Sequence, residues 1–305
     1  MKQINKGYLF VVLSAVCFGI NTIGIRYYYN VFENDTPENV AFWGMFASSL
    51  ILLPFFIISP GSRERIKTSI SRDGKIILVI SIMSTVGAYL WMLGLKFMAA
   101  GPLSLITKSQ VMYSAILGIY FLGEKFTILE FFGVVTALSG IIVISNLENE
   151  VTPAGIMIVL TSAFIYSVQS MLVKKFAGKL HGMEFTYLRA VLMALFFFII
   201  FTIYGTISLI PLKQILMLGL ISISGLMIGR SFYYEAHKHV PISKLSVGML
   251  FEPVFIIIAS YFILNEDLSR HKLMGAFLIV LGLWMTAKKN ITLRNFADIG
   301  KYFKK

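Results

Sequence analysis

The chain is divided into long apolar segments, each close to the length that a helix needs to cross a bilayer. About 20 consecutive apolar residues span the hydrocarbon core, and a backbone in lipid must satisfy its own hydrogen bonds, so only helices and closed barrels span it. These segments predict an all-α integral membrane protein of ten transmembrane helices, with short connections and no sizeable soluble domain. They lie near residues 8–29, 40–58, 75–98, 102–122, 126–146, 153–176, 184–207, 212–236, 243–264 and 271–288.

The composition agrees with a protein that lies almost entirely in the membrane. Hydrophobic residues make up 57% of the chain and charged residues 14%, whereas soluble domains carry about 25% charged residues. The single cysteine, Cys17, excludes an intrachain disulfide. The first apolar run comes after Lys2 and Lys6, like a signal peptide, but it lacks an A-x-A cleavage site, so we interpret it as a retained helix.

The basic residues are distributed unevenly between the two sides of the predicted membrane. If the N-terminus is cytoplasmic, most Lys and Arg residues fall on the cytoplasmic side, notably in residues 61–75, 174–179 and 288–305. The acidic loops 33–39 and 146–153 then lie outside. This is the positive-inside pattern, so it predicts that both termini are cytoplasmic and removes nucleic acid as an explanation of the net charge of +12. The tail, residues 289–305, is either an amphipathic helix on the anionic inner leaflet or a solvated basic segment.

The second half of the chain repeats the first. An offset of 142 residues aligns the fourth and fifth segments of each half, and an offset of 148 aligns the first segments. Because five spans is an odd number, the halves enter the membrane from opposite faces, an arrangement typical of alternating-access transporters with a midplane site. Matching pairs are Lys96 with Lys238, Ser104 with Ser246, Glu124 with Glu266, Gly133 with Gly275, Gly140 with Gly282, Ser14 with Ser162 and Asn21 with Gln169.

On these features the chain resembles the drug/metabolite transporter superfamily in its ten-helix EamA type. The resemblance covers residues 7–288 and divides them into repeats 7–146 and 153–288, with the basic tail 289–305 after them. "EPVF" at 252–255 resembles the proline-bearing fourth helix of the family, while the first half has "QVMY" there and lacks the proline. The resemblance implies a secondary carrier, often an exporter, with the fifth helices peripheral to a central cavity formed by the others.

Glu252 and Gln110 are the strongest candidates for that cavity. They occupy equivalent positions in the fourth segments, and Glu252 lies near the midplane, beside Pro253, which frees a backbone carbonyl and favours a broken helix. Two roles are open for Glu252. It could exchange a proton between facing states and couple transport to the proton gradient, or it could stay ionised and attract a cationic solute. The structural alternative is a kink with a hydrogen-bonded glutamate.

Lys108 interrupts the same apolar run as Gln110. On a continuous helix it points about 200° away from Gln110, which shares its side with Tyr113. Lys108 could line the cavity or pair with an acidic residue; alternatively it snorkels to the outer surface, which lies about 9 Å away at Pro102. Unless partnered, an ionisable residue at this depth is costly and marks function.

Further polar and aromatic residues are weaker candidates for solute binding. Arg230 with Tyr233 could form a cationic, aromatic vestibule, or Arg230 could snorkel. Asn21 and Gln169 could face the cavity or hydrogen-bond neighbouring helices, and Trp91 and Tyr113 could bind solute or pack. We interpret Arg189 as structural, and the paired glycines of the fifth segments as close-packing faces.

The sequence therefore predicts a multi-pass cell-membrane transporter (inner membrane in a Gram-negative source). It would move a small organic metabolite, such as an amino acid, outward in the manner common in the family that it resembles. We expect no catalytic set, metal or cofactor, since no phosphate-binding loop is present and histidines and cysteine are few. Its partners would be the solute and the lipid bilayer, with proton coupling and a homodimer as open alternatives. An intramembrane enzyme and a lipid-handling protein are the competing classes.

Overall fold

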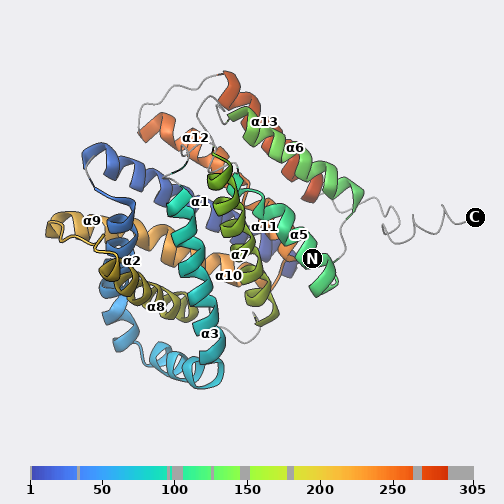
Figure 1. Ribbon diagram of the computed structural model, residues 1–305. Coiled ribbons are helices and arrows are strands. Elements are labelled where there is room, and N and C mark those ends of the chain that lie inside the picture. The colour runs from blue at the N-terminus through green and yellow to red at the C-terminus, as the bar shows by residue number, and fades with distance from the viewer. Residues whose placement is uncertain are drawn as a thin grey trace, which may run out of the picture.

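The computed structural model describes residues 2–32, 35–94, 97, 106–124, 127–144, 152–176, 182–263 and 270–287, and these are almost entirely helical (Figure 1). Seven segments of this part of the chain are long and apolar enough to cross a membrane: 6–31, 37–58, 61–94, 153–176, 182–203, 212–237 and 242–263. Three shorter apolar helices coincide with further predicted spans: 110–122, 128–143 and 273–286. The prediction of an all-α, multi-span protein is confirmed.

The helices succeed one another along the chain in two series separated by residues 145–151. The first series is α1 (Lys2–Val31), α2 (Pro37–Ile58), α3 (Pro60–Gly94), α5 (Gln110–Leu122) and α6 (Ile128–Ile144). The second is α7 (Pro153–Phe176), α8 (Gly182–Ile203), α9 (Leu212–Ser222), the π-helix η1 (Ile223–Gly229), α10 (Arg230–His237), α11 (Ile242–Gly248), α12 (Phe251–Ile263) and α13 (Arg270–Ala287). The tail 289–305, for which two alternatives were predicted, lies outside the described residues.

The sequence predicts that residues 61–75 are a cytoplasmic loop between the second and third spans, and this prediction is wrong in its secondary structure. These residues form the first part of α3, a helix of 35 residues, which at about 1.5 Å per residue is far longer than the hydrocarbon core requires. Figure 1 shows this part running across the lower end of the bundle. Charged residues misled the interpretation, since Arg, Lys and Glu favour helix where they are solvated.

Several helices start with the capping groups that polar residues supply. Thr36 accepts a hydrogen bond from the backbone N–H of Asn39 and precedes a proline at the first position of α2. At α6, Thr127 and Glu130 form a reciprocal capping box: the Thr127 N–H donates to Glu130 Oε2 at 2.7 Å, and the Glu130 N–H donates to Thr127 Oγ1. These caps satisfy N–H groups that a membrane helix cannot leave unpaired.

The helices of the two series interleave. α1 contacts η1, α10, α11 and α12, whereas α3 packs on α7 and α8. α5 lies between α7 and α11. Each of these central helices of the first series is therefore in contact with helices of the second series, as a site between the halves requires.

α6 and α13 stand apart from this arrangement. They pack side by side at one edge of the bundle (Figure 1), and glycines bring their backbones close together. A Cβ on Gly140 would lie 2.6 Å from the carbonyl oxygen of Gly275, and a Cβ on Gly133 would lie 2.8 Å from that of Gly282. The expected close-packing glycine faces of the fifth segments are confirmed.

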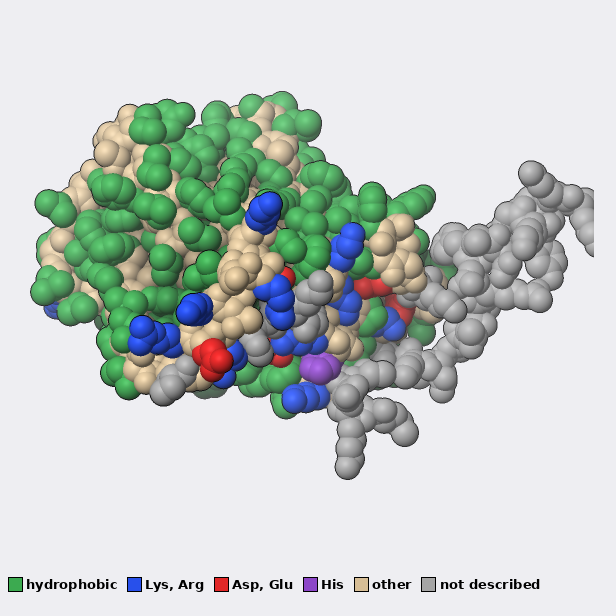
Figure 2. Space-filling view, turned by 90° about the horizontal axis from the view of Figure 1, so that it is seen from below, with side chains coloured by type: hydrophobic (Ala, Val, Ile, Leu, Met, Phe, Trp, Pro, Cys, Tyr) green, Lys and Arg blue, Asp and Glu red, His purple; other side chains and the backbone are tan. Residues whose placement is uncertain are grey.

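The outer surface is mostly apolar. Side chains such as Ile58, Phe121 and Phe262 are at least 70% exposed, which in water would be costly and in lipid is favourable. Figure 2 shows a face covered largely by hydrophobic side chains, with Lys and Arg side chains gathered toward one edge. The bundle is thus built to lie within a bilayer and to present charge to its surface.

Candidate functional site

The fourth helix of each series contains a turn that interrupts its α-helical hydrogen bonding. In the first, residues 108–109 form a turn before α5, and in the second, residues 249–250 form a turn between α11 and α12. The break expected beside Pro253 is confirmed, and Pro253 itself lies in the first turn of α12, where the missing N–H costs least. The first break forms without a proline, and nothing in the local sequence explains it.

Backbone hydrogen bonds locate the two breaks relative to each other. Each break has two hydrogen bonds that join residues three apart: Ser109 N–H to Ile106 O and Val111 N–H to Lys108 O, then Leu250 N–H to Val247 O and Glu252 N–H to Met249 O. These pairs coincide at an offset of 141 residues, one less than the sequence offset. The equivalence predicted for Gln110 and Glu252 therefore shifts by one residue at the breaks.

Lys108 and Glu252 meet between the two breaks. Lys108 Nζ lies 3.6 Å from Glu252 Oε2, and the two side chains are only 22% and 19% exposed. The distance is that of an ion pair rather than a short charge-assisted hydrogen bond. Of the two alternatives for Lys108, the structure has the ion pair and not snorkelling. The inference that Lys108 and Gln110 point about 200° apart assumed a continuous helix, and the break at Lys108 removes that premise.

The other candidates on the first series pack against α7. Ser167 donates a hydrogen bond to the backbone carbonyl of Gln110 at 3.2 Å, and Tyr113 meets Phe164 edge to face at 5.5 Å. Trp91 of α3 is partly buried and packs near Val159 of α7. These contacts fix α5 and α3 on α7 without using the side-chain amide of Gln110.

Asn21 and Gln169 are both buried and hydrogen-bonded to neighbouring helices. The amide of Asn21 donates to the carbonyl of Ile221 at 2.9 Å, and the amide of Gln169 donates to the hydroxyl of Tyr234 at 3.1 Å. Their exposed fractions are 7% and 2%. In this conformation both residues have the interhelical role that was the alternative to facing the cavity.

A π-helix, η1, interrupts the eighth predicted span, and the sequence did not reveal it. Its ends are tied to α1: Asn21 donates to Ile221 O, and Ser14 donates to Gly229 O at 2.8 Å. π-helical turns are rare and are frequent at functional sites, and they change the register of the helix beyond them. Here the first residue beyond η1 is Arg230. A signal that could have been noticed is the glycine spacing of Gly219, Gly225 and Gly229.

Arg230 and Tyr233 lie together, as expected. The guanidinium of Arg230 sits over the ring of Phe18 at 4.9 Å and over that of Tyr233 at 5.6 Å. Tyr233 is 5% exposed, and its hydroxyl shares a hydrogen bond with Ser170 of α7 at 2.9 Å. Arg230 is therefore held on aromatic faces inside the bundle rather than extended to the surface.

Arg189, for which the sequence indicates a structural role, has surroundings that single it out. It is 1% exposed, and its guanidinium lies 5.8 Å from the ring centre of Tyr234. Nη1 donates to the sulfur of Met193, whereas Nε and Nη2 have no partner among the described residues. Tyr166 of α7 lies within electrostatic range of both Arg189 and Arg230. The signal available in the sequence was a second arginine within the spans.

Polar contacts join the two series where α5 ends and α11 begins, a region called here the Lys-rich end of the bundle. Gly123, with φ of 65°, ends α5 in the left-handed region that glycine adopts freely. Glu124 then accepts hydrogen bonds at the start of α11 from the N–H groups of Ile242 and Ser243 and from the Ser243 hydroxyl. Lys244 pairs with Glu130 at 2.6 Å. The repeat counterpart of Glu124, Glu266, lies outside the described residues.

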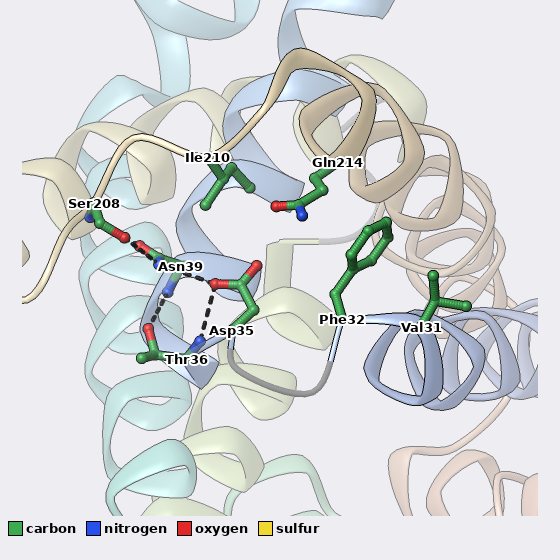
Figure 3. A pocket seen from close by; sticks show the side chains of 8 residues that line it. All are labelled: Val31, Phe32, Asp35, Thr36, Asn39, Ser208, Ile210 and Gln214. Atoms are coloured by element: carbon green, nitrogen blue, oxygen red, sulfur yellow. Dashed lines mark hydrogen bonds between the residues drawn. The ribbon is translucent and has the colours of Figure 1, made fainter.

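A recess of about 520 Å³ opens at the α1–α2 and α8–α9 connections (Figure 3). Its one lining carboxylate, Asp35, accepts hydrogen bonds from Tyr28, Asn39 and the Thr36 N–H. Asn39 also binds Ser208, as Figure 3 shows. That carboxylate is therefore satisfied by groups of the protein itself. The full lining is Val31, Phe32, Asp35, Thr36, Asn39, Ser208, Ile210 and Gln214.

Metal chemistry has no support in the described part of the chain. No group of three or more His, Cys, Asp or Glu side chains is placed there to hold an ion. Among the charged side chains of the described bundle, Lys108 and Glu252 pair with each other, whereas Arg189 and Arg230 form no ion pair in the described ranges.

The chain is similar to proteins described as transporters. The EamA-like transporter family matches residues 5–146 and 153–288. An uncharacterized transporter of Methanothermobacter thermautotrophicus is 23% identical over 92% of this chain and 85% of its own. An S-adenosylmethionine uptake transporter of Rickettsia conorii is 25% identical over 79% of each chain.

A solved structure shares the fold. A crystal structure of another protein superposes with a TM-score of 0.79, covering 92% of this chain and 96% of that one. The sequence identity is 14%. At that level the likeness shows the fold alone.

Proposed function

The chain belongs to the EamA-like transporter family and is a multi-pass protein of the cell membrane, and from that premise we propose that it carries a small organic metabolite by alternating access. The proposed carrier has ten spans in two inverted halves, residues 7–146 and 153–288, with both termini in the cytoplasm. It is not an enzyme in this proposal, because transport needs only recognition and movement by the groups inside the bundle.

The observation that carries the proposal is the Lys108–Glu252 pair. It joins the broken helix of one half to the broken helix of the other, at 3.6 Å. Broken helices with charged groups at their ends are how carriers build a midplane site between inverted halves. Such a pair can separate when the halves rock, and a solute charge can then take the place of either partner.

Amino acids and related cationic or zwitterionic compounds fit a site that contains both signs of charge. The Rickettsia relative named for S-adenosylmethionine uptake supports including that compound among the candidates. Our proposal specifies export. Since that relative is named for uptake, direction is the first property to measure once a solute is found.

Glu252 is proposed as the group that links solute to driving force. In this conformation its charge is compensated by Lys108. If the pair opens in the other facing state, Glu252 can take a proton or bind a cationic group of the solute. Exchange of solute without a gradient, compared with accumulation driven by a proton gradient, separates these two roles.

Solute flux in proteoliposomes tests the proposal. The purified full chain is reconstituted and assayed for counterflow of radiolabelled amino acids and S-adenosylmethionine, with protein-free liposomes as the control. We expect saturable exchange of at least one compound. Flux of none of them, together with phospholipid scrambling in the same vesicles, would replace the transporter with a lipid-handling protein.

A cysteine-labelling experiment tests the orientation. The cysteine is placed in residues 61–75, the basic segment predicted to be cytoplasmic. Ser62 is unsuitable for labelling because it is 2% exposed and hydrogen-bonded to Glu184. Glu64, which is exposed on α3, is the better position. In a Cys17→Ala background, Glu64→Cys should resist a membrane-impermeant reagent in intact cells and react after permeabilisation. Reaction in intact cells would reverse the topology.

A further inference from the structure

Two arginines lie inside the bundle without a carboxylate. Arg189 of α8 and Arg230 of α10 are within electrostatic range of each other, yet no ion pair joins either to an acidic residue in the described ranges. The nearby glutamates in the sequence are engaged elsewhere: Glu184 with Arg65 and Glu235 with Lys238. The Lys108–Glu252 pair differs from these arginines, because there the protein supplies both the positive and the negative charge.

The free donors of Arg189 have a specific arrangement. Nη1 is occupied by the Met193 sulfur, and the two groups without a partner are Nε and Nη2. Nε and Nη2 form one edge of the planar guanidinium, the edge whose parallel N–H groups bind two oxygens of a carboxylate or phosphate together. Arg189 is therefore held with a bidentate edge open while its other nitrogen is fixed.

Arg230 adds a second donor from the neighbouring helix. Its Nε is buried and has no partner among the described residues, and Arg230 comes directly after η1, so the π-helix sets the direction in which it projects. Aromatic rings hold both guanidiniums from their faces: Phe18 and Tyr233 for Arg230, and Tyr234 for Arg189.

The aromatic contacts do not satisfy these donors. A ring face attracts the guanidinium as a cation, but N–H groups donate in the guanidinium plane and need oxygen acceptors there. Two hydroxyls of the cluster bond to α7, Tyr233 with Ser170 and Tyr234 with Gln169, and no hydrogen bond from either arginine to a tyrosine hydroxyl is present in the described part of the chain. A fully buried guanidinium beside a second, partly buried one, both with in-plane donors that lack an acceptor among the described residues, is unfavourable without an anion.

We propose that Arg189 and Arg230 bind an oxyanion group of the transported solute, a carboxylate or a phosphate, with Arg189 as the bidentate partner. This inference rests on the proposed transport function and narrows it: the solute carries a negative oxyanion, and the tyrosines around the arginines pack against its adjoining part. Gln169 and Ser170 of α7 act as positioning residues, because they fix the tyrosines on which the arginines rest.

Binding to the purified full-length protein tests the proposal with three related probes. 3-Phenylpropanoate carries a carboxylate, phenyl phosphate carries a phosphate, and 3-phenylpropanamide carries neither, and none of the three carries an ammonium group. Dissociation constants are measured by the change in melting temperature with probe concentration in detergent. We expect at least one oxyanion probe to bind about tenfold or more tightly than the amide, and the comparison of the first two probes distinguishes carboxylate from phosphate.

Lysine substitutions separate recognition by the guanidinium edge from simple charge. Arg189→Lys and Arg230→Lys keep the positive charge and lose the planar fork, so each should weaken oxyanion binding by about tenfold or more. Arg63→Lys, at an exposed position on α3, is the matched control and should bind as the wild type does. Size-exclusion chromatography in detergent checks folding.

The outcomes distinguish this inference from the function on which it rests. Equal binding of the amide and both oxyanions to the wild-type protein overturns the inference, and this comparison needs no variant. Equal binding by folded lysine variants and wild type also overturns it. Flux of a cationic solute without any oxyanion would overturn the inference alone, whereas oxyanion binding without flux of any solute would overturn the transport function alone.

Discussion

The fourth helices and the fifth helices of the two halves are related by the same repeat but have become different kinds of structure. The fourth helices, 106–122 and 242–263, are interrupted by turns at 108–109 and 249–250 and bring Lys108 and Glu252 together inside the bundle. The fifth helices, α6 and α13, are continuous and pack through glycines at the edge of the bundle. Neither α6 nor α13 has a charged residue beyond its first turn.

The difference indicates what each pair contributes. Close glycine packing gains van der Waals contact and resists rearrangement, so the fifth helices suit a fixed scaffold. In the proposed transport cycle, the charge pair at the two turns would separate when a solute charge replaces one partner. The fourth helices therefore suit the moving part.

Removing one charge of the Lys108–Glu252 pair should have the largest effect on transport. Glu252→Gln leaves Lys108 uncompensated, which costs about 2–3 kcal/mol for a mostly buried pair and disfavours the paired state roughly 30- to 150-fold. We expect gradient-driven flux, measured in proteoliposomes with matched protein content, to fall at least about 30-fold.

A charge reversal sharpens this test. The double variant Lys108→Glu with Glu252→Lys restores an ion pair with opposite polarity. If the pair only holds the two breaks together, the double variant should recover flux; if Glu252 recognises a cation or a proton, it should not. Full activity of Glu252→Gln would show that the ion pair contributes only to packing. The difference in function drawn between the fourth and fifth helices would then be wrong.

A larger side chain between the fifth helices should affect stability more than transport. Gly140→Leu places a side chain where even a Cβ would lie 2.6 Å from Gly275 O, and overpacking of this kind costs about 1–3 kcal/mol. We expect a lower melting temperature and reduced yield, with near-normal flux per folded molecule. Val135→Leu, on the exposed side of the same helix, is the control and should change the free energy of unfolding by less than about 0.5 kcal/mol.

The tie between the end of α5 and the start of α11 should have a local effect. Glu124→Gln weakens three hydrogen bonds that cap α11, a loss of about 1 kcal/mol for a helix cap. Hydrogen exchange in residues 242–248 should become faster while exchange in α13 is unchanged. Glu64→Gln, on the exposed part of α3, serves as control. Unchanged exchange in Glu124→Gln would contradict the role of these hydrogen bonds in joining the two series at the Lys-rich end.

The smallest effect is expected from the side chain of Gln110. Its hydrogen bond with Ser167 uses the backbone carbonyl, so Gln110→Ala should change the free energy of unfolding by less than about 0.5 kcal/mol. Flux should fall less than in Glu252→Gln. If Gln110→Ala lost as much flux as Glu252→Gln, Gln110 and Glu252 would be functionally equivalent, contrary to the offset of 141 residues between the two turns.

Much of the arrangement could be predicted from the order of residues. Hydrophobic length indicated the spans, and the paired glycines of the fifth segments indicated close helix packing, which the structure contains between Gly140 and Gly275 and between Gly133 and Gly282. Pro253 indicated a broken helix. The break at Lys108 was not predicted, because no proline or glycine marks it and the surrounding helices determine where the backbone turns.

The candidate site was predicted only in part, and Arg189 shows why. Its position within a span was readable, but the open edge formed by Nε and Nη2 depends on Met193, Tyr234 and the neighbouring helices. For Asn21 and Gln169 the sequence left a cavity role and an interhelical role open, and the structure bonds them to Ile221 and Tyr234 of neighbouring helices. Sequence identifies a polar group in a span but not the partner that it finds.

The sequence by itself determined that this chain is a helical membrane protein of two repeats, because apolar length and internal similarity are readable along the chain and a backbone in lipid must satisfy its own hydrogen bonds. It also determined which ionisable residues lie at bilayer depth. The tertiary structure decided which of these are compensated: Lys108 by Glu252, across two breaks more than a hundred residues apart, and Arg189 and Arg230 by no acidic residue in the described part of the chain. The physical reason is that a charge in a low dielectric is governed by the groups within a few ångströms of it, and those groups come from helices distant in the chain.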